Sequence, residues 1–426
     1  MIGIATRSGI ALGLNLEKVI IGLDVKSGEA RKKLWWSLFR LESLLSVMTG
    51  RVSCLGNASS SANPPFLNPN LDLTVPDMEQ PINELQWTIN LDEGKALPQV
   101  SFLKSLEPTH SLYCFYMVDL TLITHTIINE IYSLDPSRVG WSCIESRIAF
   151  YHKKLDFWAS TIHPSFGSQF ISPPREPSFQ DSLALNYYSA HILLNRPSLK
   201  GPSFEKKHDS PDSGIRFANK IAFDCLQASL GAIAQLPDRP DLAWCYQVPQ
   251  WWDLLHILTQ SITILLLDIS ASPALIRPEE IQFPAESVVW AGVTKGLHWL
   301  HCLGKSSESA HRAFLFFNTC VRRMKPSKTL DQEWLSLVID SSRASCGPNY
   351  SEDESLVINL PEDSKRHISA NGEDDIVFFQ DLSGEQRILV PGALAVLDTG
   401  EKLVELVSNS DFAVEDILFS LMDCHP

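Results

Sequence analysis

The sequence lacks the features that mark membrane and secreted proteins. Its longest uninterrupted apolar run, Ile262 to Leu267, ends at Asp268 and is far too short to cross a bilayer. Its nine cysteines stand singly, without a Cys-x-x-Cys pair. Scattered cysteines favour reduced thiols in a nuclear or cytosolic compartment, and they exclude a zinc cluster built from closely spaced cysteine pairs within this sequence.

The sequence also lacks the motifs of common catalytic sites. It has no Gly-x-Ser-x-Gly, no His-Glu-x-x-His and no glycine-rich dinucleotide fingerprint, and Gly304-Lys305-Ser306 lacks the earlier glycine of a phosphate-binding loop. His298, His301 and Cys302 are neighbours in sequence, but the last two would point about 100° apart on a helix, with no fourth ligand near. We therefore expect no catalytic, cofactor or metal site in this sequence.

Negative charge is in excess, but it gathers at one end of the chain. Residues 350–426 carry 17 acidic and 4 basic residues, a net charge of −13 out of −15 for the whole chain. An acidic tail repels phosphate backbones, and the first 349 residues have no basic excess to compensate. The charge pattern therefore does not predict a stand-alone nucleic-acid-binding protein.

Apolar residues at helical spacing are abundant, most clearly between residues 27 and 51. Ser27 is a good N-cap and Gly50 a good C-terminal stop. The residues between them that recur at three and four positions are Leu34, Leu38, Leu41, Leu45 and Met48, with Trp35, Phe39 and Leu44 beside them. We expect a central helix that buries this leucine stripe and keeps its basic residues on a narrow polar side.

The same periodicity predicts further helices along the chain. The expected helical regions are 1–51 (two helices), about 100–134, 141–158, 181–199, 215–236, 249–269 and 287–324. Segments rich in Pro, Gly and Ser separate them, and no strand-like alternation competes before residue 350. The predicted fold is all-α, an irregular multi-helix stack of antiparallel helices followed by a partly disordered acidic C-terminal tail.

Several short patterns resemble those of a known family. Residues 29–36 read Glu-Ala-Arg-Lys-Lys-Leu-Trp-Trp, and Leu44-Leu-Ser46 and Gly50-Arg51 follow them; Leu193-Leu-Asn195-Arg196-Pro197 ends a later apolar helix. Together these patterns resemble the fungal-specific transcription factor domain, the middle homology region of binuclear zinc cluster (six-cysteine) regulators. Val52 stands where the family usually has Pro, and Asn195 where it usually has His.

The resemblance implies a nuclear regulator of RNA polymerase II transcription, with a regulatory or effector-response domain and no enzymatic activity. DNA binding and zinc would belong to an upstream six-cysteine cluster, so the resemblance also implies that this sequence starts inside the domain. The implied partners are coactivators or mediator-type proteins, a small-molecule effector and, in a homodimer, a second copy. The family-motif residues are Arg31, Leu34, Trp35, Trp36, Arg40, Gly50, Arg51, Arg196 and Pro197. For Arg196 we expect a structural role at a helix end.

Two domains are expected: an incomplete regulatory domain over residues 1–340 and an acidic tail over residues 341–426. Within the tail, Asp411 to Asp423 interleaves carboxylates with apolar residues, as acidic activation segments do. The residues expected to carry activation are Phe412, Ile417, Leu418 and Phe419. The competing interpretation is that this segment docks on the body of the protein, beside the apolar residues 388–397.

A function of another class also remains open. The alternative is an α-helical enzyme or small-molecule-binding protein with an unrecognised site. The adjacent tryptophans at 35–36 and 251–252 could line a pocket, although adjacent tryptophans on a helix more often serve packing. An enzyme should show an acid–base constellation with perturbed pKa values in a cleft, whereas a regulator should show a sensing pocket or an interaction face.

Overall fold

The structure is a computed structural model, and it describes part of the chain. The described residues are 2–20, 22–49, 53–55, 62, 86–91, 96–132, 140–167, 179–197, 199, 211–248, 253–271, 283–324, 379–380 and 386–387. The helices belong to one compact unit and the two short strands to another.

The described part of the chain is mainly helical, which confirms the all-α prediction. The helices are α1 (Ile2–Ala11), α2 (Glu17–Ile20), α3 (Val25–Thr49), α5 (Ala96–Ser105), α6 (His110–Ile127), α7 (Trp141–Thr161), α8 (Pro164–Gly167), α9 (Phe179–Asn195), α10 (Pro211–Ala234), α11 (Leu242–Gln247), α12 (Leu254–Ala271), α13 (Glu286–Leu303) and α14 (Glu308–Met324). A 3-10 turn, η1 (Thr88–Asn90), precedes α5, and a π-helical turn, η3 (Ile128–Tyr132), extends α6. Strands β1 (Phe379–Gln380) and β2 (Gln386–Arg387) pair antiparallel, with Phe379 opposite Arg387.

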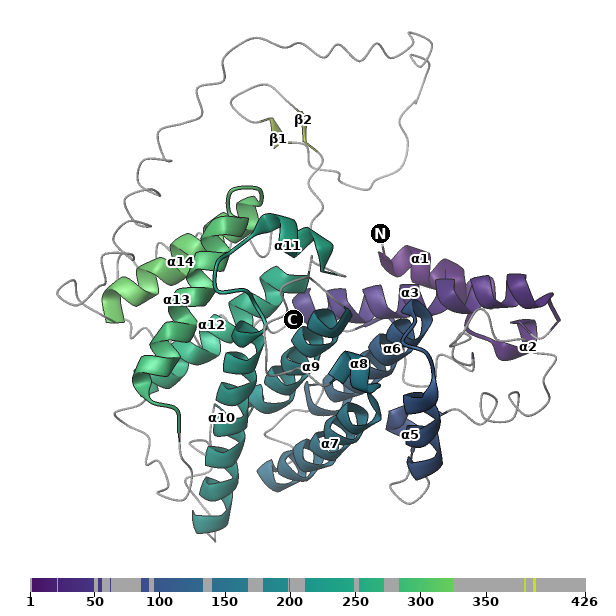
Figure 1. The fold of residues 1–426 in the computed structure, drawn as a ribbon, viewed down its shortest axis with the longest axis horizontal. Helices are drawn as coiled ribbons and strands as arrows, with labels where there is room; N and C mark the ends of the chain where they lie inside the picture. The colour runs from purple at the N-terminus through teal and green to yellow at the C-terminus, as the bar shows by residue number, and fades with distance from the viewer. Residues whose placement is uncertain are drawn as a thin grey trace. The chain divides into compact units, whose positions relative to one another are not determined.

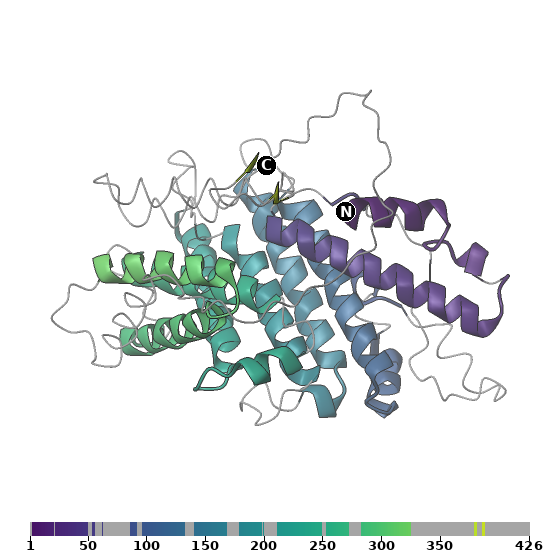
Figure 2. The same cartoon turned by 90° about the horizontal axis from the view of Figure 1, so that it is seen from above.

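The helices form an irregular stack in which a helix packs on one group of helices before it and on another group after it (Figure 1). Helix α3 packs on α1 and α6, and α6 packs on α7 and α9. Helix α9 then contacts α10 and α12, which lead on to α13 and α14. Figure 2 shows α1 lying beside α3 at the N-terminal end of this series. The signature helix α3 thus lies near one end of the stack rather than at its centre.

Helix α3 begins earlier than its sequence suggested. Its first residue is Val25, and the carboxylate of Asp24 accepts a hydrogen bond from the backbone N–H of Ser27 at 3.0 Å. Asp24 is therefore the N-cap, and Ser27 lies within the first turn. Hydrogen bonding from the Ser27 side chain, followed by that from its backbone N–H, lowers the pKa of Asp24. The predicted Ser27 cap is wrong because an aspartate three residues earlier satisfies the same free N–H groups.

Two further boundaries differ from the predictions. The region expected to be helical over residues 100–134 contains two helices, since Pro108 falls between α5 and α6. Thr109 caps the second helix, accepting from the N–H of Leu112 at 3.3 Å. The short helix α11 was not predicted, because its six residues are too few to show a period.

The buried face of α3 differs from the predicted leucine stripe. Leu34, Leu41 and Met48 are exposed, whereas Trp35, Trp36 and Phe39 are buried. Only one of the two faces of α3 can face the core. Burying the aromatic face removes more apolar area from water per residue, so that face is the more favourable one to bury. The prediction that α3 buries its leucine stripe is therefore wrong.

Helix α6 forms the centre of the largest hydrophobic core. With η3 it is the helix, among the described residues, that is long and apolar enough to cross a membrane by length and composition. Its side chains explain that composition, since Phe115, Ile123 and Ile127 are fully buried in a cluster shared with α7 and α9. Its apolar character is that of a core helix.

Candidate functional site

The Leu-Trp-Trp signature of α3 anchors that helix through its aromatic residues. The Trp36 ring meets Trp87 edge-on at 4.8 Å between centroids and Phe39 at 5.5 Å. Trp87 in turn stacks on Phe115 of α6 at 5.3 Å. Trp35 is fully buried in the same cluster as Leu14 and Ile20. The tryptophan pair therefore packs helices together rather than lining a pocket.

The basic residues of the signature have separate environments. Lys32 is buried and pairs with Glu17 of α2 at 3.4 Å and with Glu29 at 3.6 Å. Arg31 is half-buried, and Lys33 is exposed. Because the pair with Glu17 joins α2 to α3, this lysine stabilises the turn between the two helices.

Arg40, one turn after Trp36, reaches a carboxylate far away in sequence. Its guanidinium Nη2 lies 3.9 Å from Oδ2 of Asp253, the residue directly before α12. The carboxylate is almost fully buried, and neither of its oxygens has a hydrogen-bond partner among the described residues. The pair joins α3, near the N-terminus, to the later helices of the stack.

Burial dominates the electrostatics of this pair. It raises the pKa of the Asp253 carboxyl to about 6, although the positive charge of Arg40 acts in the opposite direction. Burial also lowers the pKa of the Arg40 guanidinium, which remains protonated. Asp253 is thus a carboxylate that changes charge near neutral pH.

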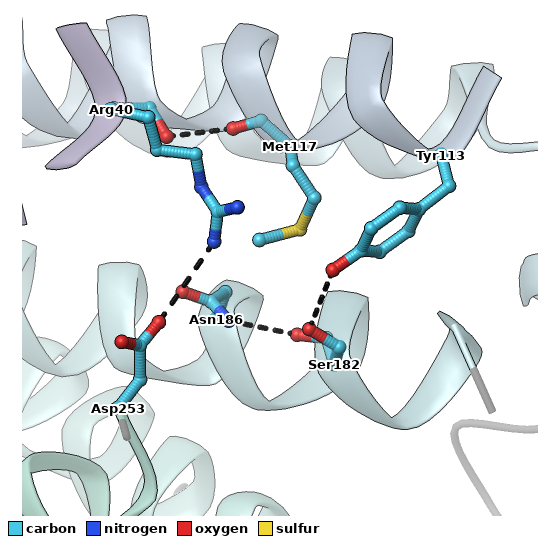
Figure 3. Close-up of polar contacts among 7 residues, drawn as sticks. Arg40, Tyr113, Met117, Ser182, Asn186 and Asp253 are labelled. Atoms are coloured by element: carbon cyan, nitrogen blue, oxygen red, sulfur yellow. Dashed lines mark hydrogen bonds and ion pairs between the residues drawn. The ribbon is translucent and has the colours of Figure 1, made fainter. Parts of the chain in front are cut away.

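Polar side chains from two other helices surround the pair (Figure 3). The Arg40 guanidinium projects between Met117 of α6 and Asn186 of α9 toward Asp253. The Asn186 amide donates to the carbonyl of Ser182 at 3.0 Å, and the Ser182 and Tyr113 hydroxyls lie 3.0 Å apart. Four helical segments therefore meet at one polar centre. We call Arg40, Tyr113, Ser182, Asn186 and Asp253 the Arg40 centre.

The second signature motif lies at the end of α9. The helix ends at Asn195, two residues before Pro197, as the restricted backbone before a proline requires. The Arg196 guanidinium lies over the Tyr132 ring at 5.2 Å, and the Tyr132 hydroxyl donates to the carbonyl of Leu193. Arg196 also adds to burial in lowering the pKa of His256 to about 4. These contacts join η3, α9 and α12.

The remaining predicted residues lie outside the described residues. They are Gly50 and Arg51 of the first signature and Phe412, Ile417, Leu418 and Phe419 of the tail. Of the histidines considered as metal ligands, His301 packs against the ring of Phe314 at 5.0 Å. Within the described ranges, no group of three His, Cys, Asp or Glu side chains is arranged to hold a metal ion.

Sequence reasoning missed most of the Arg40 centre. Of its five residues the sequence motifs point only to Arg40, while Asp253 falls at the start of a predicted helix and Tyr113, Ser182 and Asn186 belong to no motif. A weak signal was present, because Asp253 directly precedes the most apolar stretch of the chain, where an ionised side chain needs a partner.

Comparison with known proteins agrees with the signature. The model of the fungal specific transcription factor domain matches residues 1–160. A transcription regulator from Aspergillus niger, galc, is 32% identical over 362 residues, which cover 77% of this chain and 44% of that protein. The fusaridione A cluster transcription factor fsdR of Fusarium heterosporum is 22% identical over 281 residues, or 64% of this chain and 46% of that protein.

The chain therefore spans less than half the length of these two relatives. No solved structure matches it. The family and the named relatives are transcription regulators rather than enzymes. Helices α1, α3 and α6 and the Leu-Trp-Trp signature all lie inside the matched range, so residues 1–160 are the part of this chain that matches a fungal specific transcription factor domain.

Proposed function

We propose that the chain is the regulatory part of a nuclear regulator of RNA polymerase II transcription. The observation that carries this proposal is the match of residues 1–160 to the fungal specific transcription factor domain, together with the buried tryptophan pair of its signature. In this proposal a six-cysteine cluster, which the present sequence does not contain, would bind the zinc and the DNA. Coactivators or mediator-type proteins are the proposed partners.

A tethering experiment tests this function. The whole chain is fused to an unrelated DNA-binding domain, and transcription of a reporter is measured in fungal cells. The expected result is a change in reporter level, in either direction, relative to the DNA-binding domain alone. Equal reporter levels would count against a regulatory function, provided that the fusion accumulates in the nucleus.

The acidic tail is the proposed activation segment. Residues 411–423 alternate carboxylates with large apolar residues, a composition that suits coupled folding into an apolar groove of a coactivator. Residues 372–426 fused to the same DNA-binding domain should activate the reporter, and replacing Phe412, Ile417, Leu418 and Phe419 with Ala should abolish that activation. Replacing Ile388, Leu389 and Val390 with Ala is the matched control, expected to leave it unchanged. A silent fusion would remove the activation role from the tail.

The Arg40 centre is the proposed effector-responsive site. It supports this role because Asp253 offers buried carboxylate oxygens without hydrogen-bond partners among the described residues, beside the donors of Arg40. A small polar effector with N–H or O–H groups would supply the missing donors.

The effector role is tested with the tethered chain in cells grown on different carbon and nitrogen sources. Asp253→Asn keeps the size of the side chain and removes its charge, so it should make reporter output independent of the medium. The control Asp238→Asn changes an exposed aspartate that pairs with Lys295 on the surface, and its response should remain. A medium-dependent response that survives in Asp253→Asn would rule out this site.

A further inference from the structure

The two charges of the Arg40 centre lie close together without a hydrogen bond between them. Nη2 of Arg40 is 3.9 Å from Oδ2 of Asp253, whereas a hydrogen-bonded pair of these groups has a distance of about 2.7–2.9 Å. Both carboxylate oxygens are buried without a hydrogen-bond partner among the described residues. Among the residues drawn in Figure 3, the guanidinium contacts only this carboxylate. The pair therefore lacks the additional hydrogen bonds that stabilise buried ions.

The pair is open on the arginine side. The side chain of Arg40 is 19% exposed, and that of Asp253 is 3% exposed. The guanidinium points toward the carboxylate between Met117 of α6 and Asn186 of α9 (Figure 3). A small molecule that approaches the guanidinium from solvent would therefore meet a buried acceptor next to it.

The two opposite charges restrict the chemistry of a ligand. An amine would add a second positive charge beside Arg40, and a carboxylic acid would add a second negative charge beside Asp253. A neutral hydroxyl compound brings no charge, and its hydrogen bonds to ions are weaker than those between two ionised groups. A zwitterion offers an ammonium to the carboxylate and a carboxylate to the guanidinium. It is therefore the class of ligand that complements both residues.

The spacing of the two charges favours α-amino acids among zwitterions. One carbon atom separates their ammonium nitrogen from their carboxylate carbon, so these atoms are about 2.5 Å apart. The charged groups of Arg40 and Asp253 are similarly close, at 3.9 Å. A zwitterion with a longer spacer holds its charges farther apart and could face both residues only if they separated. The planar fork of the guanidinium also matches the two oxygens of a carboxylate.

We propose that the Arg40 centre binds the α-ammonium and α-carboxylate groups of a free amino acid. The ligand carboxylate lies against the guanidinium of Arg40, and the ligand ammonium lies against the carboxylate of Asp253. This inference rests on the proposed effector role of the centre and names the class of effector. Arg40 belongs to α3 and Asp253 directly precedes α12, so the bound amino acid bridges the matched range and the later helices.

Thermal unfolding of the full chain tests the binding. The twenty proteinogenic amino acids are added in pools, and each member of an active pool is then titrated by calorimetry. At least one amino acid should raise the unfolding temperature. Its two half-molecules are the amine without the carboxylate and the acid without the ammonium, which for L-alanine are ethylamine and propionate. Each should bind at least about tenfold more weakly, because it loses one set of charged hydrogen bonds.

Substitutions locate the binding. Asp253→Asn keeps the size of the side chain and removes its charge, so it should weaken amino acid binding at least about tenfold. Arg40→Lys, a second variant, keeps the positive charge without the planar fork and should also bind more weakly. The matched control is Asp238→Asn, which changes the exposed partner of Lys295 and should leave the affinity unchanged. Circular dichroism confirms that each variant is folded.

The pH dependence separates a binding role from a structural one. Burial raises the pKa of Asp253 to about 6, and only its ionised form pairs with an ammonium. The affinity should therefore rise between pH 5 and pH 7, by up to about tenfold per pH unit below pH 6, and should be constant in Asp253→Asn. Tyr113 and Cys114 of α6 also face Arg40. Burial raises the pKa of the Cys114 thiol and a tyrosine titrates at about pH 10, so both stay neutral in this range.

Several results would overturn the inference. They are the absence of stabilisation by every pool, equal affinity of Asp253→Asn and the unaltered chain, and binding of the carboxylic acid half-molecule as tight as that of the amino acid. None of them decides the proposed function, because the medium-dependent reporter response is measured separately. A reporter response that requires Asp253, without amino acid binding, would overturn the amino acid class alone and keep the effector role.

Discussion

At the residue scale, Asp119 is an acid whose protonation is coupled to folding. This residue of α6 is buried, and its carboxylate accepts from the N–H of Thr88 at 2.8 Å and from the Thr88 hydroxyl at 2.7 Å. Burial raises its pKa to about 7, although the Thr88 hydrogen bonds and the charge of Lys154 act in the opposite direction. The contact holds η1 against α6.

The raised pKa predicts how stability changes with pH. The folded chain holds the Asp119 proton up to about pH 7, whereas the unfolded chain releases it near pH 3.8, so the folded state binds more protons between these values. The contribution of Asp119 is complete below pH 3.8 and is lost as the pH rises to about 7. Its slope reaches about 1.4 kcal/mol per pH unit.

The measurement is urea unfolding between pH 4 and pH 8. Asp119→Asn keeps an acceptor for the Thr88 N–H and a donor for its hydroxyl, and it has no proton to lose. The difference in unfolding free energy between this variant and the unaltered chain should grow in favour of the variant as the pH rises. A difference independent of pH would show that Asp119 is ionised throughout.

Single residues were the least predictable from sequence. The tryptophans of the signature were recognised, but the ion pair between Arg40 and Asp253 joins residues more than 200 positions apart. Helical periodicity carries no information about such a pair, because it describes only neighbours within one turn or two. The Arg40 centre therefore became visible only when α3, α6, α9 and the start of α12 were placed together.

At the element scale, the two faces of α3 should differ sharply in their contribution to stability. Trp35→Ala removes a fully buried ring and should cost about 3–5 kcal/mol of unfolding free energy. Leu34→Ala removes an exposed side chain next to it and should change the free energy by less than about 0.5 kcal/mol. Urea unfolding of both variants provides the check. A larger loss for Leu34→Ala would restore the leucine stripe as the buried face.

A glycine marks a close contact among the later helices. A Cβ atom on Gly296 of α13 would lie 2.8 Å from Cγ1 of Ile262 of α12 and 3.3 Å from Cδ1 of Ile233 of α10. Gly296→Ala should therefore lower the unfolding free energy, since overpacking costs about 1–3 kcal/mol and the gain in helix propensity is at most about 1 kcal/mol.

Gly3→Ala in α1 is the matched control, because a Cβ there meets no atom within 4 Å. This variant should be unchanged or slightly more stable, and thermal unfolding compares the two. Equal stability of Gly296→Ala and the unaltered chain would mean that α12 and α13 lie farther apart than described.

Most long helices were predictable because each repeats its apolar period over several turns. Boundaries depended on single residues, such as the Asp24 cap and the break at Pro108, and were predicted less well. The choice between two apolar faces of α3 could not be made from its own sequence, since both have helical spacing. It depends on α1 and α6, which cover the aromatic face.

At the scale of the whole molecule, the matched domain and the later helices are parts of one packed body. Helices α6 and α7, within residues 1–160, contact α9, and α9 contacts α10 and α12. The similarity to the Aspergillus niger regulator also extends well past residue 160, since it covers 77% of the chain. The Arg40 centre therefore lies where the matched domain and the later helices pack directly on each other.

The charge of the whole chain leads to the last prediction, that this sequence alone does not bind DNA specifically. It contains no closely spaced cysteine pairs for a zinc cluster, and its net charge of −15 opposes approach to a phosphate backbone. In fluorescence polarisation at physiological salt, labelled duplexes should bind no more tightly than the micromolar range typical of non-specific contacts. The matched positive control is the same chain fused to a six-cysteine zinc cluster, which should bind the DNA site of that cluster. Nanomolar, sequence-selective binding by the unfused chain would contradict the prediction, because it would require a DNA-reading surface within these 426 residues.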